Sequence, residues 1–240
     1  MRSWPLGAGI ALAGLGYWTA FRPSSQAFRP FPVQGKATDP VIALTFDDGP
    51  NEPYTSRLLA VLAERGVRAT FFMVGRCAER FPATVRAVVK AGHVLGNHSY
   101  SHSFSSYLTM PTQRTELQRC QDCLAAIAGV QPGLYRPPWL CHWPWVLASV
   151  RAAGLRAVSG RFGHPLEIFQ PAAGRIAATA ARVARPGAIM IFHDGFDARG
   201  GVRDQTVAAI GPLIDTLRAR GYRFATVDEM LGVPPYLNSG

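Results

Sequence analysis

The stretch Val41–Pro50 reads VIALTFDDGP, and the organisation of the chain follows from it. Its first six residues are apolar except for Thr45, which predicts a strand covered on both faces. A glycine and a proline then end the strand, so Asp47 and Asp48 are expected at its C-terminal edge. Two carboxylates there can border one cleft, where one can bind a metal while the other acts as a general acid or base. Considered alone, the motif fits a turn or a helix cap equally well.

Composition predicts one globular domain and sets limits on its partners. The chain has 240 residues, of which 48% are hydrophobic, and this is enough for one large core. The formal net charge of +10 favours polyanions, but the basic residues are mostly arginines scattered singly along the chain. Basic runs interleaved with aromatic residues do not occur, so we expect no nucleic-acid partner. An anionic cell-wall or membrane surface fits the scattered arginines.

The N-terminal segment 1–21 is expected to be a signal peptide or a membrane anchor. After a basic start at Arg2, the stretch Trp4–Phe21 contains no charged residue. Small residues before a possible cleavage point after Ala27 favour a signal peptide, whereas the unbroken apolar length with aromatic ends favours an anchor. The polar, proline-containing segment 22–40 predicts a linker. Both alternatives predict an exported protein of the cell envelope that meets the membrane through this segment.

Strand and helix patterns then alternate along residues 41–231. The helical patterns cover residues 54–65, 81–91, 111–130, 144–153, 173–184 and 202–220. After the first strand, further strand patterns cover residues 67–74, 93–95, 155–158, 188–192 and 222–225. About seven β-α repeats predict an α/β fold with a mostly parallel sheet or barrel, followed by a tail over residues 232–240. In such folds the chemistry lies at the C-terminal ends of the strands.

Two histidines predict a metal site at one of these ends. His98 and His102 follow a predicted strand four residues apart, so one turn of helix would bring both rings to the same side. Such a spacing also arises by chance in exposed or hydrogen-bonded histidines. Asp48 offers a third ligand from another strand end. Two histidines and a carboxylate leave open positions for water on a catalytic zinc or a similar ion.

Two further residues are candidates for proton transfer and charge pairing. His193 ends the apolar run 188–192 and can serve as a general acid or base, although a strand-end turn also explains it. Arg136 precedes two prolines, so it stands on a stiff extended segment. A guanidinium held in this way can make paired hydrogen bonds to a carboxylate. From Arg136 alone, a surface ion pair is the simpler interpretation.

The motifs, taken in order, resemble a known family. They are TFDDGP, His98-Ser99 with His102, Arg136-Pro137-Pro138 and Ile191-Phe192-His193. This series resembles the polysaccharide deacetylase (NodB-homology) family of carbohydrate esterases, and the likeness covers roughly Val41 to Leu231. The resemblance implies a distorted (β/α) barrel and a metal-dependent hydrolysis that removes acetyl groups from N-acetylated sugars.

The resemblance also implies roles for individual residues. Asp47 corresponds to the catalytic base, Arg136 to its partner and His193 to the catalytic acid. Asp48, His98 and His102 correspond to the metal ligands. The implied cofactor is a divalent metal, zinc first, with cobalt, nickel or manganese as alternatives. The implied substrate is an N-acetylated or O-acetylated polysaccharide, such as chitooligosaccharide or peptidoglycan; a same-fold hydrolase of a non-sugar C–N bond and a non-catalytic glycan-binding domain are the alternative functions.

Two motifs depart from the family pattern. Trp139-Leu140 stands where the third motif usually continues with Tyr-Gly, which predicts a differently shaped groove wall. The fourth motif usually supplies an Asp that orients the acid histidine and a Trp beside the acetyl group, and residues 158–165 contain neither. Phe162 is a candidate for the apolar wall, and His164 or Glu167 for the partner of His193. Without an acidic partner His193 would be less basic, so activity is expected to fall at a lower alkaline pH.

Overall fold

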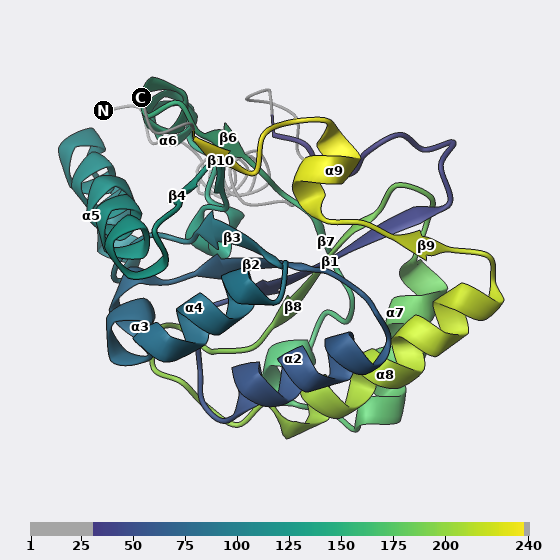
Figure 1. Ribbon diagram of the computed structural model, residues 1–240. Helices are drawn as coiled ribbons and strands as arrows, with labels where there is room; N and C mark the ends of the chain where they lie inside the picture. Colours follow the sequence, from purple (N-terminus) through teal and green to yellow (C-terminus); the bar gives the residue numbers. More distant parts are fainter. Residues whose placement is uncertain (1–30, 238–240) are drawn as a thin grey trace, which may run out of the picture.

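The computed structural model describes residues 31–237, and they form an α/β fold around a curled parallel sheet (Figure 1). Its strands are β1 (Val41–Asp47), β2 (Thr70–Met73), β3 (Val94–Asn97), β5 (Leu134–Tyr135), β6 (Arg156–Ala157), β7 (Arg161–Phe162), β8 (Ile189–His193) and β9 (Arg223–Phe224). The order is β6-β5-β3-β2-β1-β8-β7, β9 pairs with β1, and every pair is parallel. The expected parallel α/β architecture is therefore confirmed.

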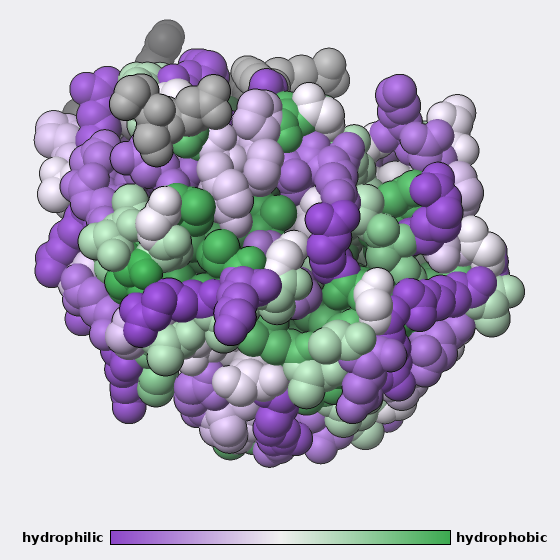
Figure 2. All heavy atoms as spheres, viewed as in Figure 1, coloured by the Kyte–Doolittle hydropathy of each residue, from purple (hydrophilic) through white to green (hydrophobic). Residues whose placement is uncertain are grey.

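Helices cover the outer side of this sheet. They are α2 (Tyr54–Glu64), α3 (Gly75–Arg80), α4 (Pro82–Lys90), α5 (Met110–Ala128), α6 (Pro144–Ala152), α7 (Ala173–Val183), α8 (Asp204–Ala219) and α9 (Val227–Leu231). Figure 1 shows α2 and α8 side by side along the lower edge of the molecule. On the face shown in Figure 2, hydrophilic residues cover much of the periphery and apolar residues form patches between them. The six helices expected from the sequence are present within two residues at each end, and α3 and α9 are additional.

Strand alternation separates the apolar core from the site. Phe46 of β1, Phe71 of β2 and Phe192 of β8 lie in the main core cluster with apolar residues of the helices. Neighbouring side chains on a strand point to opposite faces, so Thr45 and Asp47 lie on the concave side. There the hydroxyl of Thr45 donates a hydrogen bond to the carbonyl oxygen of Met190 at 2.8 Å.

The sheet forms a half-barrel rather than a complete ring, and the described part of the segment before β1 crosses the opening. β6 and β7 are the two ends of the strand order. The N–H of Ser159 donates to the carbonyl of Pro32 at 2.8 Å, and Gln34 forms an antiparallel bridge with Ala188. Ser159 lies in the connection between β6 and β7, and Ala188 directly precedes β8. Because the bridge is antiparallel, residues 31–35 run in the direction opposite to β8.

The structure describes most of the predicted C-terminal tail but not the predicted signal or anchor stretch. The expected signal or anchor stretch Trp4–Phe21 lies outside the described residues. Within residues 31–237, no helix has the length and apolar character needed to cross a membrane. In the segment expected to be a tail, β10 (Tyr236–Leu237) pairs antiparallel with β4 (Gln131–Pro132).

Candidate active site and metal centre

Asp48, His98 and His102 come together as a buried group at the C-terminal ends of β1 and β3. Nε2 of His98 lies 3.3 Å from Oδ1 of Asp48, and Nε2 of His102 lies 3.1 Å from the same oxygen. One ligand atom from each residue lies within 4.8 Å of the others. The expected helix is wrong, because residues 98–103 form a loop in which Ser99 (φ 68°) and His102 (φ 54°) adopt left-handed backbone. These turns bring the rings together without a helix.

Hydrogen bonds fix which ring nitrogen of each histidine is free to bind an ion. Nδ1 of His98 lies 2.6 Å from the carbonyl oxygen of Arg136, and Nδ1 of His102 lies 2.8 Å from Oδ1 of Asp197. Because the carbonyl and the carboxylate can only accept, each Nδ1 carries the proton and donates it. Both Nε2 atoms then face the carboxylate of Asp48, and each would offer its lone pair to an ion that takes the place of the proton there. A carboxylate and two imidazoles presented in this way suit a divalent ion such as zinc.

The surroundings of Asp48 keep its carboxylate ionised and oriented for binding a metal ion. Asp48 has left-handed backbone (φ 73°), which interrupts the strand alternation after Asp47, and both carboxylates line the same cavity. The other oxygen of Asp48, Oδ2, accepts the N–H of Asp197 at 3.0 Å. Burial opposes ionisation, but the charge and hydrogen bonds of His102, with the hydrogen bond of His98, outweigh it and hold the pKa of Asp48 well below its usual value. Asp48 is thus an anion with one oxygen available for a cation.

Asp47 and Arg136 form a buried ion pair beneath the cavity. Nη1 of Arg136 donates to Oδ1 of Asp47 at 2.7 Å and to Oγ1 of Thr45 at 2.6 Å, and Nη2 donates to the carbonyl of Ser159 at 2.9 Å. The side chain of Arg136 is fully buried, so the surface ion pair favoured from the sequence is wrong. Its guanidinium also lies 4.1 Å over the ring of Phe72. These contacts fix the orientation of Asp47.

His193 has an acidic partner, and it is Glu167, one of the two candidates named from the sequence, so the loss of basicity expected without such a partner does not occur. Oε2 of Glu167, in the short 3-10 helix η3 (Glu167–Phe169), lies 2.6 Å from Nδ1 of His193. Burial lowers the pKa of His193, but the charge and hydrogen bond of Glu167, with the charges of Asp48 and Asp47, raise it to about 9. His164 is not the partner, because its Nδ1 accepts the N–H of Leu166 at 3.0 Å. His193 is therefore protonated at neutral pH.

A cavity of about 390 Å³ joins these groups. Asp47 and His193 are register partners on the adjacent strands β1 and β8, and both line the cavity beside the metal-binding group. The ring of Trp139, in the 3-10 helix η2 (Pro138–Leu140), lies 4.4 Å from the His102 ring. Phe162 stacks on His193 at 6.3 Å, where the sequence suggested an apolar wall. The candidate metal ligands, the candidate base and acid, and two apolar side chains therefore all surround one small space.

Sequence reasoning missed two contributors to this site. Asp197 holds His102 and Asp48, and the only signal for it was a second acid three residues after Asp194 in a strand-end loop. Ser159 contributes a backbone carbonyl, for which side-chain identity carries no signal. Both residues reach the site because their loops pack against the ends of strands that are distant in sequence.

A buried carboxylate–histidine–histidine group, with a carboxylate and a protonated histidine beside it, is the arrangement of a metal-dependent hydrolase. Comparison with known families identifies the class further. The family model described as polysaccharide deacetylase matches residues 34–158, more than half of the chain. The chain belongs to the polysaccharide deacetylase family.

Curated relatives support the same assignment. The chain is 33% identical over 192 residues to a peptidoglycan-N-acetylglucosamine deacetylase of Bacillus cereus, covering 80% of this chain and 88% of the relative. It is 34% identical over 190 residues to a chitooligosaccharide deacetylase of Sinorhizobium fredii, covering 76% of this chain and 88% of the relative.

Solved structures agree on the fold. A peptidoglycan N-acetylglucosamine deacetylase is 28% identical, with a TM-score of 0.77 over 85% of this chain and 93% of that one. A family 4 carbohydrate esterase from Streptomyces lividans is 30% identical, with a TM-score of 0.68 over 78% of this chain and 91% of that one.

Proposed function

We propose that this chain is a metal-dependent deacetylase that hydrolyses N-acetyl groups of an envelope or extracellular glycan. One observation carries the proposal: Asp47 and His193 are register partners on adjacent strands and border the same cavity as Asp48, His98 and His102. A general base and a general acid are thus held on adjacent strands beside an ion site. Amide hydrolysis needs this combination, because a water must lose a proton and the amine must gain one.

The ion has a defined place and task. Asp48, His98 and His102 would hold a divalent metal, for which we propose zinc, with cobalt, nickel or manganese as alternatives. When bound, such an ion supplies a Lewis acid for the acetyl carbonyl and lowers the pKa of water. The chain's own contribution is to present two Nε2 lone pairs and one carboxylate oxygen to it, with both Nδ1 atoms already engaged.

Two side-chain pairs, Asp47 with Arg136 and His193 with Glu167, define the proposed proton transfers. Asp47, held by the cationic Arg136, accepts the proton of the attacking water. His193, kept protonated by Glu167, donates from Nε2 to the nitrogen of the sugar as the C–N bond breaks. Acetate and a free amine are the products. Trp139 and Phe162 wall the cavity and provide apolar faces for a pyranose ring and an acetyl methyl group.

The substrate class and the location come from the relatives. The two named above are deacetylases of peptidoglycan N-acetylglucosamine and of chitooligosaccharide, and we infer that this chain acts on a glycan of the same kind. Peptidoglycan is a polymer of the cell envelope, which agrees with the export expected from the uncharged stretch Trp4–Phe21.

Acetate release from chitooligosaccharide, peptidoglycan and acetylated xylan, with and without chelator, tests the proposal. We expect about one divalent ion per chain in the wild type and loss of that ion in His98→Ala and His102→Ala. Restoring zinc, cobalt, nickel or manganese to the stripped protein identifies the active metal. Full metal occupancy in both variants would place the ion elsewhere. Glycan binding with a bound ion but no acetate release would instead indicate a non-catalytic glycan-binding domain.

A further inference from the structure

The exposed large apolar side chains of residues 31–237 all lie at the end of the sheet where the cavity opens. Those with the largest exposure are Phe169 at 73% and Leu108 at 69%. The complete set, here called the apolar rim, is Phe104, Leu108, Met110, Trp139, Phe162, Leu166, Phe169, Phe196 and Val202. They stand in the connections that follow β3, β5 and β8 and in and after β7. Because these strands are parallel, their C-terminal ends meet at one edge of the fold.

The exposed charged residues in the loops that carry the apolar rim are cationic. These loops cover residues 98–110, 136–143, 159–172 and 194–203, and they contain no exposed Asp or Glu. Their acids, Glu167, Asp194 and Asp197, are buried or half-buried and serve the site. Two arginines, Arg161 and Arg199, are exposed in the same loops, and Nε of Arg199 lies 3.4 Å from Oδ2 of Asp197 while its side chain stays 80% exposed. A surface with apolar side chains, exposed arginines and no exposed acid fits an anionic lipid bilayer, where apolar groups enter the headgroup region and arginines meet lipid phosphates.

Phe31, the first described residue, packs against residues at the same end of the fold. Phe31 is buried in one apolar cluster with Leu140, which lines the cavity, and its ring stacks on His142 at 4.6 Å. Only residues 22–30 separate Phe31 from the uncharged stretch Trp4–Phe21. A segment of that length reaches at most about 30 Å when fully extended. An anchor formed by Trp4–Phe21 would therefore hold the cavity end of the domain, rather than its opposite end, near the membrane.

We propose that the apolar rim docks on an anionic bilayer in which Trp4–Phe21 is inserted, so that the cavity opens toward the lipid headgroups. Scattered apolar residues are ordinary on protein surfaces, but confinement of all of them to one rim around one opening marks an interaction surface. The docking itself does not depend on catalysis. Its consequence for substrate choice rests on the proposed function: the glycan reached is one held at the membrane surface, such as an N-acetylated sugar linked to a lipid.

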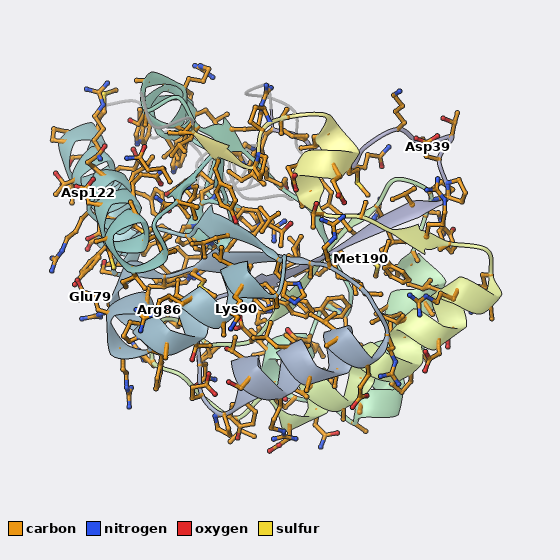
Figure 3. All side chains as sticks on the ribbon, viewed as in Figure 1. Asp39, Glu79, Arg86, Lys90, Asp122 and Met190 are labelled. Carbon is orange, nitrogen blue, oxygen red and sulfur yellow. The ribbon has the colours of Figure 1, made fainter. Side chains whose placement is uncertain are left out.

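Site-specific fluorescent probes on the full chain test the docking. A polarity-sensitive fluorophore is placed at Phe169→Cys in the rim and, as the matched control, at Asp39→Cys, an exposed position just before β1 at the opposite end of the sheet (Figure 3). Cys77, Cys120 and Cys141 are buried, and the half-buried Cys123 is replaced by serine in both proteins. Both proteins are inserted into vesicles of phosphatidylglycerol and phosphatidylethanolamine that carry a lipid-attached quencher.

The proposal predicts a blue shift and lipid-dependent quenching at position 169 and neither at position 39. The response at 169 should weaken when phosphatidylcholine replaces phosphatidylglycerol. Equal exposure of both probes to a water-soluble quencher would overturn the docking. A shift at 169 caused by soluble chitooligosaccharide without vesicles would also overturn it, because the rim would then be a wall of the glycan groove.

A substrate comparison separates this proposal from the proposed function. Leu166→Ser combined with Phe169→Ser removes two rim side chains that do not line the cavity. Acetate release from soluble chitooligosaccharide should stay within about twofold, while release from a lipid-linked N-acetylglucosamine in the same vesicles should fall about tenfold or more, since both lost contacts are apolar. Equal rates on both substrates would overturn the inferred substrate class. If the wild type releases no acetate from either substrate, the proposed function fails, and the probe measurement still decides the docking.

Discussion

Oε2 of Glu167 lies 2.6 Å from Nδ1 of His193, and this contact supplies the acidic partner that residues 158–165 lack. Glu167 is itself held, because its Oε1 accepts a hydrogen bond from the hydroxyl of Thr206 in α8. The carboxylate is buried, so its charge acts on His193 with little screening by solvent. A different residue from a different position thus restores the function of the missing aspartate.

Glu167→Gln should move the alkaline limb of the turnover profile to lower pH. The pKa of His193 is raised to about 9, so the imidazole stays protonated below that value and loses its proton as the pH rises through it. The charge of Glu167 makes the largest contribution that raises the pKa of His193. Without it, the midpoint of the alkaline limb should move to a pH lower by roughly one to two units. The pH dependence of kcat measures this, with the exposed Glu64→Gln as control. An unchanged limb would mean that His193 is not the group that titrates there.

Asp197→Asn should weaken metal binding while leaving the three ligands in place. Oδ1 of Asp197 accepts a hydrogen bond from Nδ1–H of His102 at 2.8 Å, and a carboxylate in that position orients the ring and makes Nε2 a stronger ligand for the ion. We expect a loss of about 10- to 100-fold in metal affinity. Competition with a chelating dye measures the affinity, and the exposed Asp39→Asn serves as control. Equal affinities in both variants would exclude this role for Asp197.

Asp47→Asn should separate the base from the metal ligands. The substitution preserves shape but removes the proton acceptor, so turnover should fall by about 10²- to 10⁴-fold while the metal content stays near that of the wild type. Single-turnover acetate release and metal analysis of the same preparation test both halves. Loss of the ion together with activity would make Asp47 a ligand instead of a base.

Gly195→Ala should disturb the metal site through the backbone of Asp48. A Cβ atom at Gly195 would lie 2.3 Å from the carbonyl oxygen of Asp48, closer than any real contact, so the strand ends must move apart. Gly174→Ala is the matched control, because a Cβ there meets nothing within 4 Å and the residue lies in α7. We expect a lower Tm and weaker metal binding for Gly195→Ala, and a gain of roughly 0.5–1 kcal/mol in the control. Equal Tm values for both variants would contradict the close packing of β1 and β8 ends.

The sequence alone determined the parallel α/β fold and the groups that meet at its C-terminal edge. An apolar run ending in Asp47-Asp48 and another ending in His193 predict buried strands with polar ends, and parallel strands bring such ends to one edge. The pair His98 and His102 was found from its place after a strand, although the helical turn inferred from its spacing is absent. These predictions succeeded because each rests on a short run of residues and on one topological rule.

The tertiary structure decided which of the candidate side chains become partners and added partners that the sequence had not indicated. Glu167 reaches His193 because η3 packs beside β8, and Asp197 reaches His102 across 95 residues of sequence. Arg136 has the same local sequence whether it lies on the surface or is buried, and only the register of β1 against its neighbours places Asp47 beside it. Hydrophobic periodicity encodes which face of an element is buried, but partners from distant loops depend on register and loop backbone, including the left-handed residues Ser99 and His102, which the local pattern does not encode.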